Sequence, residues 1–168
     1  RVATKSADPD SYGTLYQWGR LGDGHEYRSS ATVATQSTAD VPGHGSFISM
    51  LLFSDWRNPP NTNLWQGESG INNPCPAGFR LPTEAEWAIE RASWISQNSA
   101  GAFASPLKLA SAGVRDWNGK LLNAGILGLY WSSTVKDTDS RNLYFTKTSA
   151  GMSNNGRIGG LSVRCIKD

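Results

Sequence analysis

The chain has 168 residues, of which 38% are hydrophobic and 18% are charged, and its net charge is +2. The 16 basic residues are scattered singly, so we expect no surface that binds nucleic acid. No apolar run approaches the roughly 20 residues of a membrane span, so we expect no membrane insertion. The length suits a single domain over residues 1–168. Because the chain begins at Arg1 without a methionine or signal peptide, we expect one module of a longer protein.

The first third of the chain is mostly polar and rich in turn-forming residues. One segment alternates at every second position, as in a strand or an extended segment: Tyr12, Thr14, Tyr16 and Trp18. The apolar run 47–53 is expected to be buried, as a strand or a short helical turn. Residues 54–73 are nearly all loop, and loops of this length inside a compact domain are usually functional.

One helix is predicted to begin at Thr83. Thr83 and Glu86 have the spacing of a capping box, in which each side chain accepts a hydrogen bond from the backbone N–H of the other residue. Apolar residues then recur at helical spacing and predict a buried stripe: Trp87, Ala88, Ala92, Trp94 and Ile95. We expect this helix to cover about residues 83–97.

Short strands are predicted after the helix, over residues 128–134, 142–145 and 160–166. Irregular polar segments join them. Strands that follow a helix in this way predict an α+β fold with an antiparallel sheet.

The chain has two cysteines, Cys75 and Cys165, which lie 90 positions apart without a CxxC motif. This spacing disfavours zinc and thioredoxin-like sites. A bridge across so long a loop would stabilise the fold by roughly 4–5 kcal/mol on the chain-entropy argument. We favour a disulfide over two buried free thiols, and a disulfide is typical of an extracellular or cell-surface protein.

Residues 73–87 read Asn-Pro-Cys-Pro-Ala-Gly-Phe-Arg-Leu-Pro-Thr-Glu-Ala-Glu-Trp, and they resemble the central signature of the Fibrobacter succinogenes major paralogous domain family. Further segments agree with the family's pattern in order and spacing: 15–20 with 23–25, 130–134 and 160–168. The resemblance spans about residues 12–168. It implies a C-type-lectin-like fold in a secreted or surface-anchored bacterial protein, including large calcium-rich adhesins, whose modules bind sugars or peptides.

The chain departs from that family at its beginning. Members usually carry an additional strand upstream of the point where this sequence starts. The C-terminal strand is therefore expected to find its partner elsewhere in the chain, unless the domain is bounded differently here.

Patterns for catalysis are weak. The two histidines, His25 and His44, lie in glycine-flanked polar loops without a nucleophile motif. Bridged cysteines could not supply the reactive thiols of formylglycine-generating enzymes, which share the implied fold. A hydrolase with paired carboxylates would need them to converge across a cleft, which spacing does not show. We therefore expect no enzymatic activity.

Two kinds of metal site are considered. His25 and Glu26 after Asp23 could ligate a metal, but we favour a turn in which Asp23 bonds its own backbone and His25 packs against aromatic rings. Calcium is the stronger hypothesis, because it binds carboxylate, amide and carbonyl oxygens, which are dense in segments 55–63 and 137–142. Turns alone would explain each segment equally well. The expected calcium ligands are Asp55, Asn61, Asn63, Asp137 and Asp139.

Seven tryptophans are present. We assign Trp18, Trp87, Trp94 and Trp131 to the core because they lie in periodic segments. The others lie in polar loops, where each either anchors its own loop or contacts a ligand: Trp56, Trp65 and Trp117.

We expect the ligand site on loops and strands between residues 116 and 157, which combine hydrogen-bond acceptors, donors and a tryptophan. The expected ligand-binding residues are Asp116, Trp117, Asn118, Asp139, Arg141, Asn142, Asn154, Asn155 and Arg157. The expected function is that of a non-catalytic adhesin module, with calcium-assisted recognition of a peptide or carbohydrate on a host or neighbouring cell. The alternative is a structural spacer, or a module that binds another subunit of its own surface protein.

Overall fold

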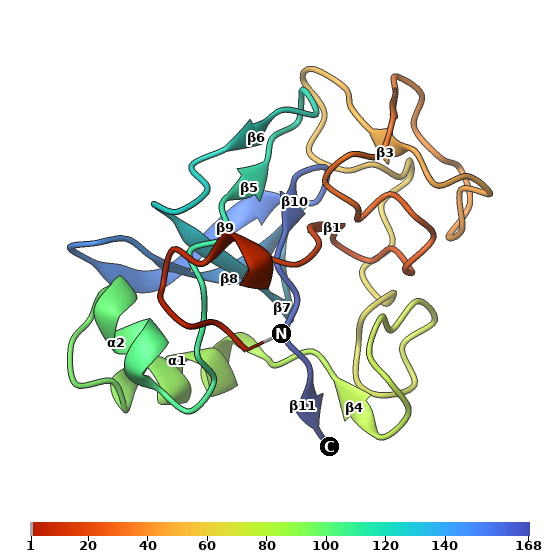
Figure 1. The fold of residues 1–168 in the computed structure, drawn as a ribbon. Coiled ribbons are helices and arrows are strands. Elements are labelled where there is room, and N and C mark those ends of the chain that lie inside the picture. The colour runs from red at the N-terminus through yellow and green to blue at the C-terminus, as the bar shows by residue number, and fades with distance from the viewer. Residues whose placement is uncertain (1) are drawn as a thin grey trace.

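A computed structural model describes residues 2–168 as a mixed α and β domain made mostly of short strands (Figure 1). Two helices, α1 (Glu84–Ala92) and α2 (Ser99–Ala104), lie together beside the longest sheet. A short 3₁₀ helix, η1 (Pro9–Ser11), lies near the start of the chain. This arrangement confirms the α+β prediction. None of the helices in residues 2–168 has the length and apolar character needed to cross a membrane.

The longest strands form an antiparallel sheet in the order β7–β8–β9. They are β7 (Gly128–Lys136), β8 (Asp139–Phe145) and β9 (Ala150–Gly156). The first two confirm predicted strands, whereas β9 was not predicted. Its sequence, Ala-Gly-Met-Ser-Asn-Asn-Gly, is rich in residues that strands disfavour. Continuous pairing with β8 supplies the hydrogen bonds that its own propensity does not favour.

A second antiparallel sheet has the order β1–β10–β5–β6. Its strands are β1 (Tyr16–Gln17), β10 (Gly160–Leu161), β5 (Val114–Arg115) and β6 (Leu121–Leu122). Two isolated pairs complete the architecture. They are β4 (Phe79–Arg80) with β11 (Ile166–Lys167), antiparallel, and β2 (Thr32–Val33) with β3 (Phe47–Ile48), parallel.

The predicted strand 160–166 is two strands, β10 and β11, which pair with different partners. Between them Ser162 forms a bridge with Tyr130 of β7, so the chain passes from one sheet to another. The C-terminal strand β11 pairs with β4, which gives it a partner within the chain.

Helix α1 is shorter than predicted. Its capping box is present, because the Glu86 N–H donates to Thr83 Oγ1 and the Thr83 N–H donates to the Glu86 carboxylate. The helix ends at Ala92, and Asn98 then caps a separate helix by accepting from the N–H groups at the start of α2. The predicted stripe is therefore wrong at Ala92, which is exposed, and at Ile95, which is 97% exposed, although Trp87 and Trp94 are buried.

The apolar run 47–53 is buried only at its start. Phe47 and Ile48 lie in β3 and are fully buried. The chain then turns, Leu52 has a φ of +73°, and its side chain is 91% exposed. Because the strand ends after two residues, the expectation of a buried segment is wrong for residues 51–53.

Six of the seven tryptophans are buried: Trp18, Trp56, Trp65, Trp87, Trp94 and Trp131. Five of these donate their indole N–H to an oxygen, so most of these rings are buried with their polar group satisfied. The four core assignments are confirmed. Trp56 and Trp65 anchor their own loops in the core.

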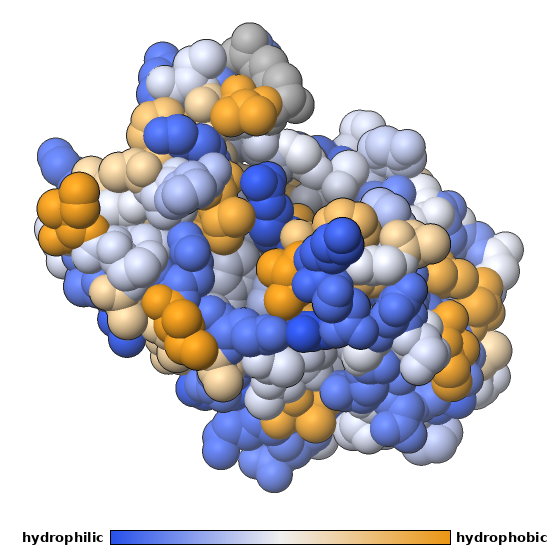
Figure 2. Space-filling view, turned by 90° about the horizontal axis from the view of Figure 1, so that it is seen from below, coloured by the Kyte–Doolittle hydropathy of each residue, from blue (hydrophilic) through white to orange (hydrophobic). Residues whose placement is uncertain are grey.

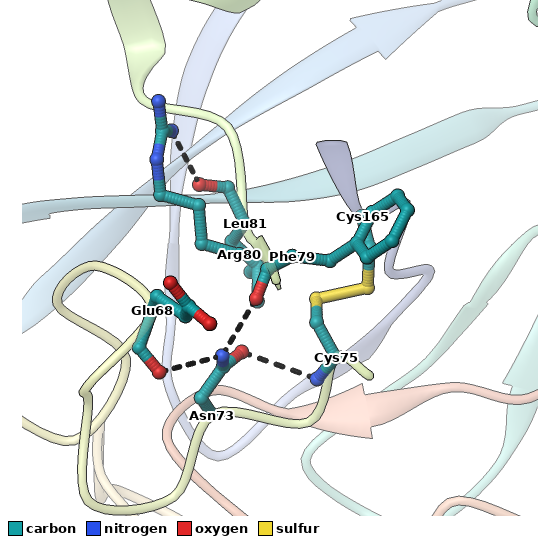
Figure 3. The surroundings of a disulfide bond; sticks show 7 residues. All are labelled: Glu68, Asn73, Cys75, Phe79, Arg80, Leu81 and Cys165. Carbon is teal, nitrogen blue, oxygen red and sulfur yellow. Dashed lines mark hydrogen bonds between the residues drawn. A yellow bond between two sulfur atoms is a disulfide. The ribbon is translucent and has the colours of Figure 1, made fainter. Parts of the chain in front are cut away.

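The disulfide Cys75–Cys165 is present, with an S–S distance of 2.03 Å, and it confirms the predicted bridge (Figure 3). The side chain of Asn73 holds the surrounding loop. Its amide donates to the carbonyls of Glu68 and Phe79, and its oxygen accepts from the Cys75 N–H. The bridge and this network attach the loop before β4 to the segment that leads into β11.

Candidate functional site

A hollow of about 190 Å³ lies where the β5–β6 hairpin, the loop at residues 53–54 and the hairpin of β8 and β9 meet. We call it the Trp117 hollow. Four of the predicted ligand-binding residues line it: Asp116, Trp117, Asp139 and Asn155. Its apolar lining comes from Val114, Ile158 and Leu161. The two sheets thus bring together four residues that were predicted to bind ligand.

Two exposed aromatic rings belong to this hollow. Trp117 is 40% exposed and Phe53 is 45% exposed. The backbone at Trp117 is fixed, because its carbonyl accepts from the Ser49 hydroxyl and its N–H donates to Asp116 Oδ1. Phe53 was missed because the run 47–53 was expected to be buried. Its position at the border of a long polar loop was the available signal.

The hollow holds two half-buried carboxylates, Asp116 and Asp139. Asp116 Oδ1 accepts from the Trp117 N–H at 2.8 Å, and Asp139 Oδ2 accepts from the Asn154 amide at 2.6 Å. Within residues 2–168, neither carboxylate forms an ion pair, and each has one oxygen without a hydrogen bond. Both therefore retain acceptors and a negative charge for a ligand.

Arg115 contributes to the lining, but its guanidinium is engaged elsewhere. Side chains alternate along a strand, so Arg115 points away from the face that carries Val114 and Asp116. Its guanidinium donates to the Tyr27 carbonyl and to Ser30, and it lies 4.3 Å from the Phe47 ring centroid.

Arg157 is fully buried, so its predicted role as an exposed ligand donor is wrong. Its Nη1 pairs with Asp55 at 3.2 Å, and its Nε donates to Ser140 Oγ. Its Nη2 donates to the carbonyls of Asp137 and Asp139. One cation therefore joins the two segments that were expected to bind calcium. Because these strongly polar groups are buried away from water, they form hydrogen bonds and an ion pair with one another.

Two of the expected calcium ligands of segment 55–63, Asp55 and Asn61, have side chains bonded to protein groups, and the third, Asn63, is exposed. The Asp55 carboxylate accepts from Arg157 and from the Arg57 N–H, while burial raises the pKa of Asp55. The Asn61 amide donates to Asp40, and the Asn61 oxygen accepts from the Asn63 N–H. This geometry does not support calcium at segment 55–63.

The remaining predicted ligand residues lie outside the hollow. Asn142 is fully buried, with its oxygen bonded to the Asn155 amide, so its expected contact with ligand is wrong. Arg141 pairs with Glu84 of α1 at 2.5 Å. Asn118 and Asn154 are exposed, and Asn154 contacts the hollow through its bond to Asp139.

Asp23, His25 and Glu26 form a group that could hold a metal ion, since their ligand-type atoms lie within 4.8 Å of one another. Both ring nitrogens of His25 already have partners. Its Nε2 accepts from the Gln17 N–H at 3.1 Å, and its Nδ1 lies 2.7 Å from Asp23 Oδ1. A metal at Nδ1 would require a proton at Nε2, which would then face the Gln17 donor.

The structure confirms the turn that the sequence favoured here. Asp23 Oδ1 accepts from the His25 N–H, and the His25 ring meets Tyr16 edge-on at 5.7 Å. Burial alone would raise the pKa of Asp23, but hydrogen bonds from His25 and Arg20 outweigh it and hold that pKa at about 2. Burial lowers the pKa of His25, which favours the neutral ring. This network fixes residues 17–26.

A second depression, of about 280 Å³, lies beside α1 and is lined mainly by apolar side chains, including Trp87, Ile89, Leu107 and Ile166. The view from below in Figure 2 shows apolar side chains in several separate patches, with hydrophilic residues between them. This face therefore does not present one continuous apolar surface.

Comparison with protein-family models, with curated proteins and with solved structures finds no match to the chain. The chemistry of the Trp117 hollow is therefore the basis of the proposed function.

Proposed function

We propose that this chain is a non-catalytic module that binds its ligand in the Trp117 hollow. The observation that carries the proposal is the combination of two exposed aromatic rings with two carboxylates that have no ion-pair partner among residues 2–168. Aromatic rings contribute strongly to binding at partly wet sites, and a few polar groups set orientation and specificity.

The size of the hollow suits part of a larger ligand. Its volume of about 190 Å³ is below the roughly 300–1,000 Å³ of sites that enclose a whole small molecule. One sugar ring, or one side chain projecting from a peptide, fits this scale. We propose such a peptide or carbohydrate on a cell surface as the ligand.

The proposal includes an extracellular setting and an adhesin role within a longer chain. The disulfide supports an oxidising compartment. The resemblance of residues 73–87 to the Fibrobacter succinogenes major paralogous domain family supports a C-type-lectin-like fold. Short strands, long loops and a capped helix after residue 83 are in line with that fold.

Arg157 joins the two segments that calcium was expected to join. Calcium was expected to fix the two long segments and to assist the ligand. Arg157 joins the same segments through Asp55 and through the carbonyls of Asp137 and Asp139. We therefore propose that the hollow recognises its ligand directly, with Arg157 as the cation that orders its walls.

Two other classes of protein can be distinguished from a ligand-binding module by experiment. A hydrolase could use Asp116 and Asp139 as paired carboxylates, and it would cleave the glycan that it binds. A spacer or subunit-binding module would use the apolar depression beside α1 and leave the Trp117 hollow empty.

The test is binding of the folded chain to glycan and peptide arrays, followed by the variants Trp117→Ala and Phe53→Ala. We expect each variant to weaken binding by about tenfold or more, because buried aromatic contacts dominate such sites. Tyr27→Ala is the matched control, since Tyr27 is exposed and outside the lining. Array ligands that bind Trp117→Ala as well as the parent would contradict the proposal. Cleavage of a bound glycan would favour the hydrolase.

A further inference from the structure

We propose that the Trp117 hollow takes a cationic side chain, lysine or arginine, projecting from a peptide segment of the partner. This inference rests on the proposed function, and it chooses between the peptide and carbohydrate ligands that the function leaves open. Charge, apolar lining and the rigidity of the walls support it.

The charge inside the hollow is negative. Asp116 and Asp139 each present a free carboxylate oxygen, and the lining holds one cationic residue, Arg115, whose guanidinium is bonded on the opposite face. Arg157, between the lining residues Gly156 and Ile158, is fully buried and paired with Asp55. Half-buried charges attract an incoming cation more strongly than fully solvated ones, because water screens them less.

Lys136 is the cation nearest to Asp139 in the sheet register, since the two residues pair across the β7–β8 turn. No ion pair joins them in the structure of residues 2–168, and Lys136 is exposed. Within residues 2–168, a ligand cation can therefore reach the Asp139 carboxylate without displacing a cation of the protein.

The apolar parts of the hollow suit the rest of such a side chain. Lysine and arginine bury their methylene stems on apolar surfaces while the charged end stays among polar groups. The exposed Phe53 and the half-buried Val114 offer that surface. An exposed indole such as Trp117 attracts a cation to its face. The protein already uses this contact internally, because the Arg157 guanidinium lies 4.8 Å from the Trp18 ring centroid.

A neutral sugar would use the aromatic rings and could donate its hydroxyls to the carboxylates, but it carries no positive charge to pair with them. A cation gains from the rings and from both charges. The walls are also held before binding, since the Ile158 N–H donates to the Ser54 carbonyl and Ser49 holds Trp117. A preformed site loses less ordering entropy on binding.

The experiment is an NMR titration of the ¹⁵N-labelled chain, following the indole N–H signal of Trp117, which is assigned by its loss in Trp117→Phe. The probes are capped Gly-Lys-Gly and Gly-Arg-Gly peptides, the same peptide with norleucine in place of lysine, and a set of methyl glycosides. We expect the lysine and arginine peptides to shift the signal. The norleucine peptide should bind at least about tenfold more weakly, because it lacks the charge.

Matched variants test the two carboxylates. Asp116→Asn and Asp139→Asn should each weaken the lysine peptide about tenfold, as expected for loss of a charge-assisted contact. Asp137→Asn is the control, because it removes the same charge from an exposed residue outside the lining. Its φ of +52° is a conformation that asparagine adopts readily.

The outcomes separate this inference from the function on which it rests. Equal binding of the lysine and norleucine peptides, or a response to glycosides alone, would overturn the cationic ligand and leave the hollow as a binding site. If neither the probes nor any array ligand perturbs Trp117, both the inference and the proposed function are wrong.

Discussion

Arg157 shows how a single buried charge can organise a surface. A buried guanidinium is costly unless carboxylate and carbonyl oxygens surround it. Here it bonds Asp55, Ser140 and the carbonyls of the β7–β8 turn, and it stacks on Trp18. These partners come from segments far apart in the sequence, so the residues around Arg157 did not predict them.

Arg157→Met should lower the free energy of unfolding by about 3–5 kcal/mol, because it leaves the Asp55 carboxylate buried without its partner. Urea unfolding measures this loss. Adding Asp55→Asn to the same chain should recover part of it by removing the uncompensated charge. Arg141→Met is the control, since its pair with Glu84 is partly exposed and should cost less than about 1 kcal/mol. Equal losses for the two single variants would contradict the assigned role.

The network around His25 makes stability depend on pH. Burial lowers the pKa of His25 from 6.5 in the folded chain, so below pH 6.5 the unfolded chain binds a proton that the folded chain resists. The stability present above pH 6.5 is therefore lost as the pH falls. Asp23, with its pKa lowered from 3.8 to about 2, adds a loss below about pH 4 in the same direction.

We therefore expect the urea midpoint to fall between pH 7.5 and pH 5.5. In His25→Gln the fall over this interval should be smaller, whatever the absolute stability of the variant, because glutamine does not titrate. His44→Gln serves as the exposed histidine control and should keep the parent's dependence. The same slope in His25→Gln and the parent would show that another group is responsible.

At the scale of single residues, the sequence predicted which residues line the hollow better than it predicted which residues are buried. Asp116, Trp117, Asp139 and Asn155 do meet in one hollow. Arg157 has the same polar character in the sequence, yet it is buried. Exposure depends on how distant strands pack over a residue, and neither composition nor period encodes that packing.

At the scale of elements, the sequence predicted the start of helix α1 better than its length. The capping box at Thr83 involves contacts over three residues, and the sequence predicted it correctly. The end of α1 depends on Asn98 beginning another helix and on Trp94 packing against Phe145. Strand β9 depends on pairing with β8, so its own residues did not predict it.

Thr83→Ala should lower the free energy of unfolding by about 1 kcal/mol, because the Glu86 N–H loses its acceptor at the start of the helix. Thr83→Ser keeps the hydroxyl and should retain most of the parent's stability. Thermal melts of the three chains give the comparison. An alanine variant as stable as the parent would show that the box contributes nothing to folding.

At the scale of the whole molecule, two covalent or ionic connections hold distant segments together. The disulfide attaches β11 to the loop before β4 and closes a segment of 90 residues. Arg157 attaches the loop at Asp55 to the β7–β8 turn beside the Trp117 hollow. Because most of the strands have only two residues, these connections join segments that the short strand pairs alone hold weakly.

These two connections predict a loss of stability on reduction and no change on addition of a calcium chelator. Reduction of Cys75–Cys165 should lower stability by roughly 2–5 kcal/mol, because the unfolded chain regains the entropy of a long loop. EGTA should leave the melting temperature unchanged, because Arg157 already joins the segments around Asp55 and Asp137. Calorimetry gives the melting temperature of the protein as purified, with added calcium, with EGTA and after reduction. The reduced sample is the control that shows that the assay detects a loss of stability. A melting temperature that falls with EGTA and returns with calcium would place an ion in the fold and contradict the role assigned to Arg157.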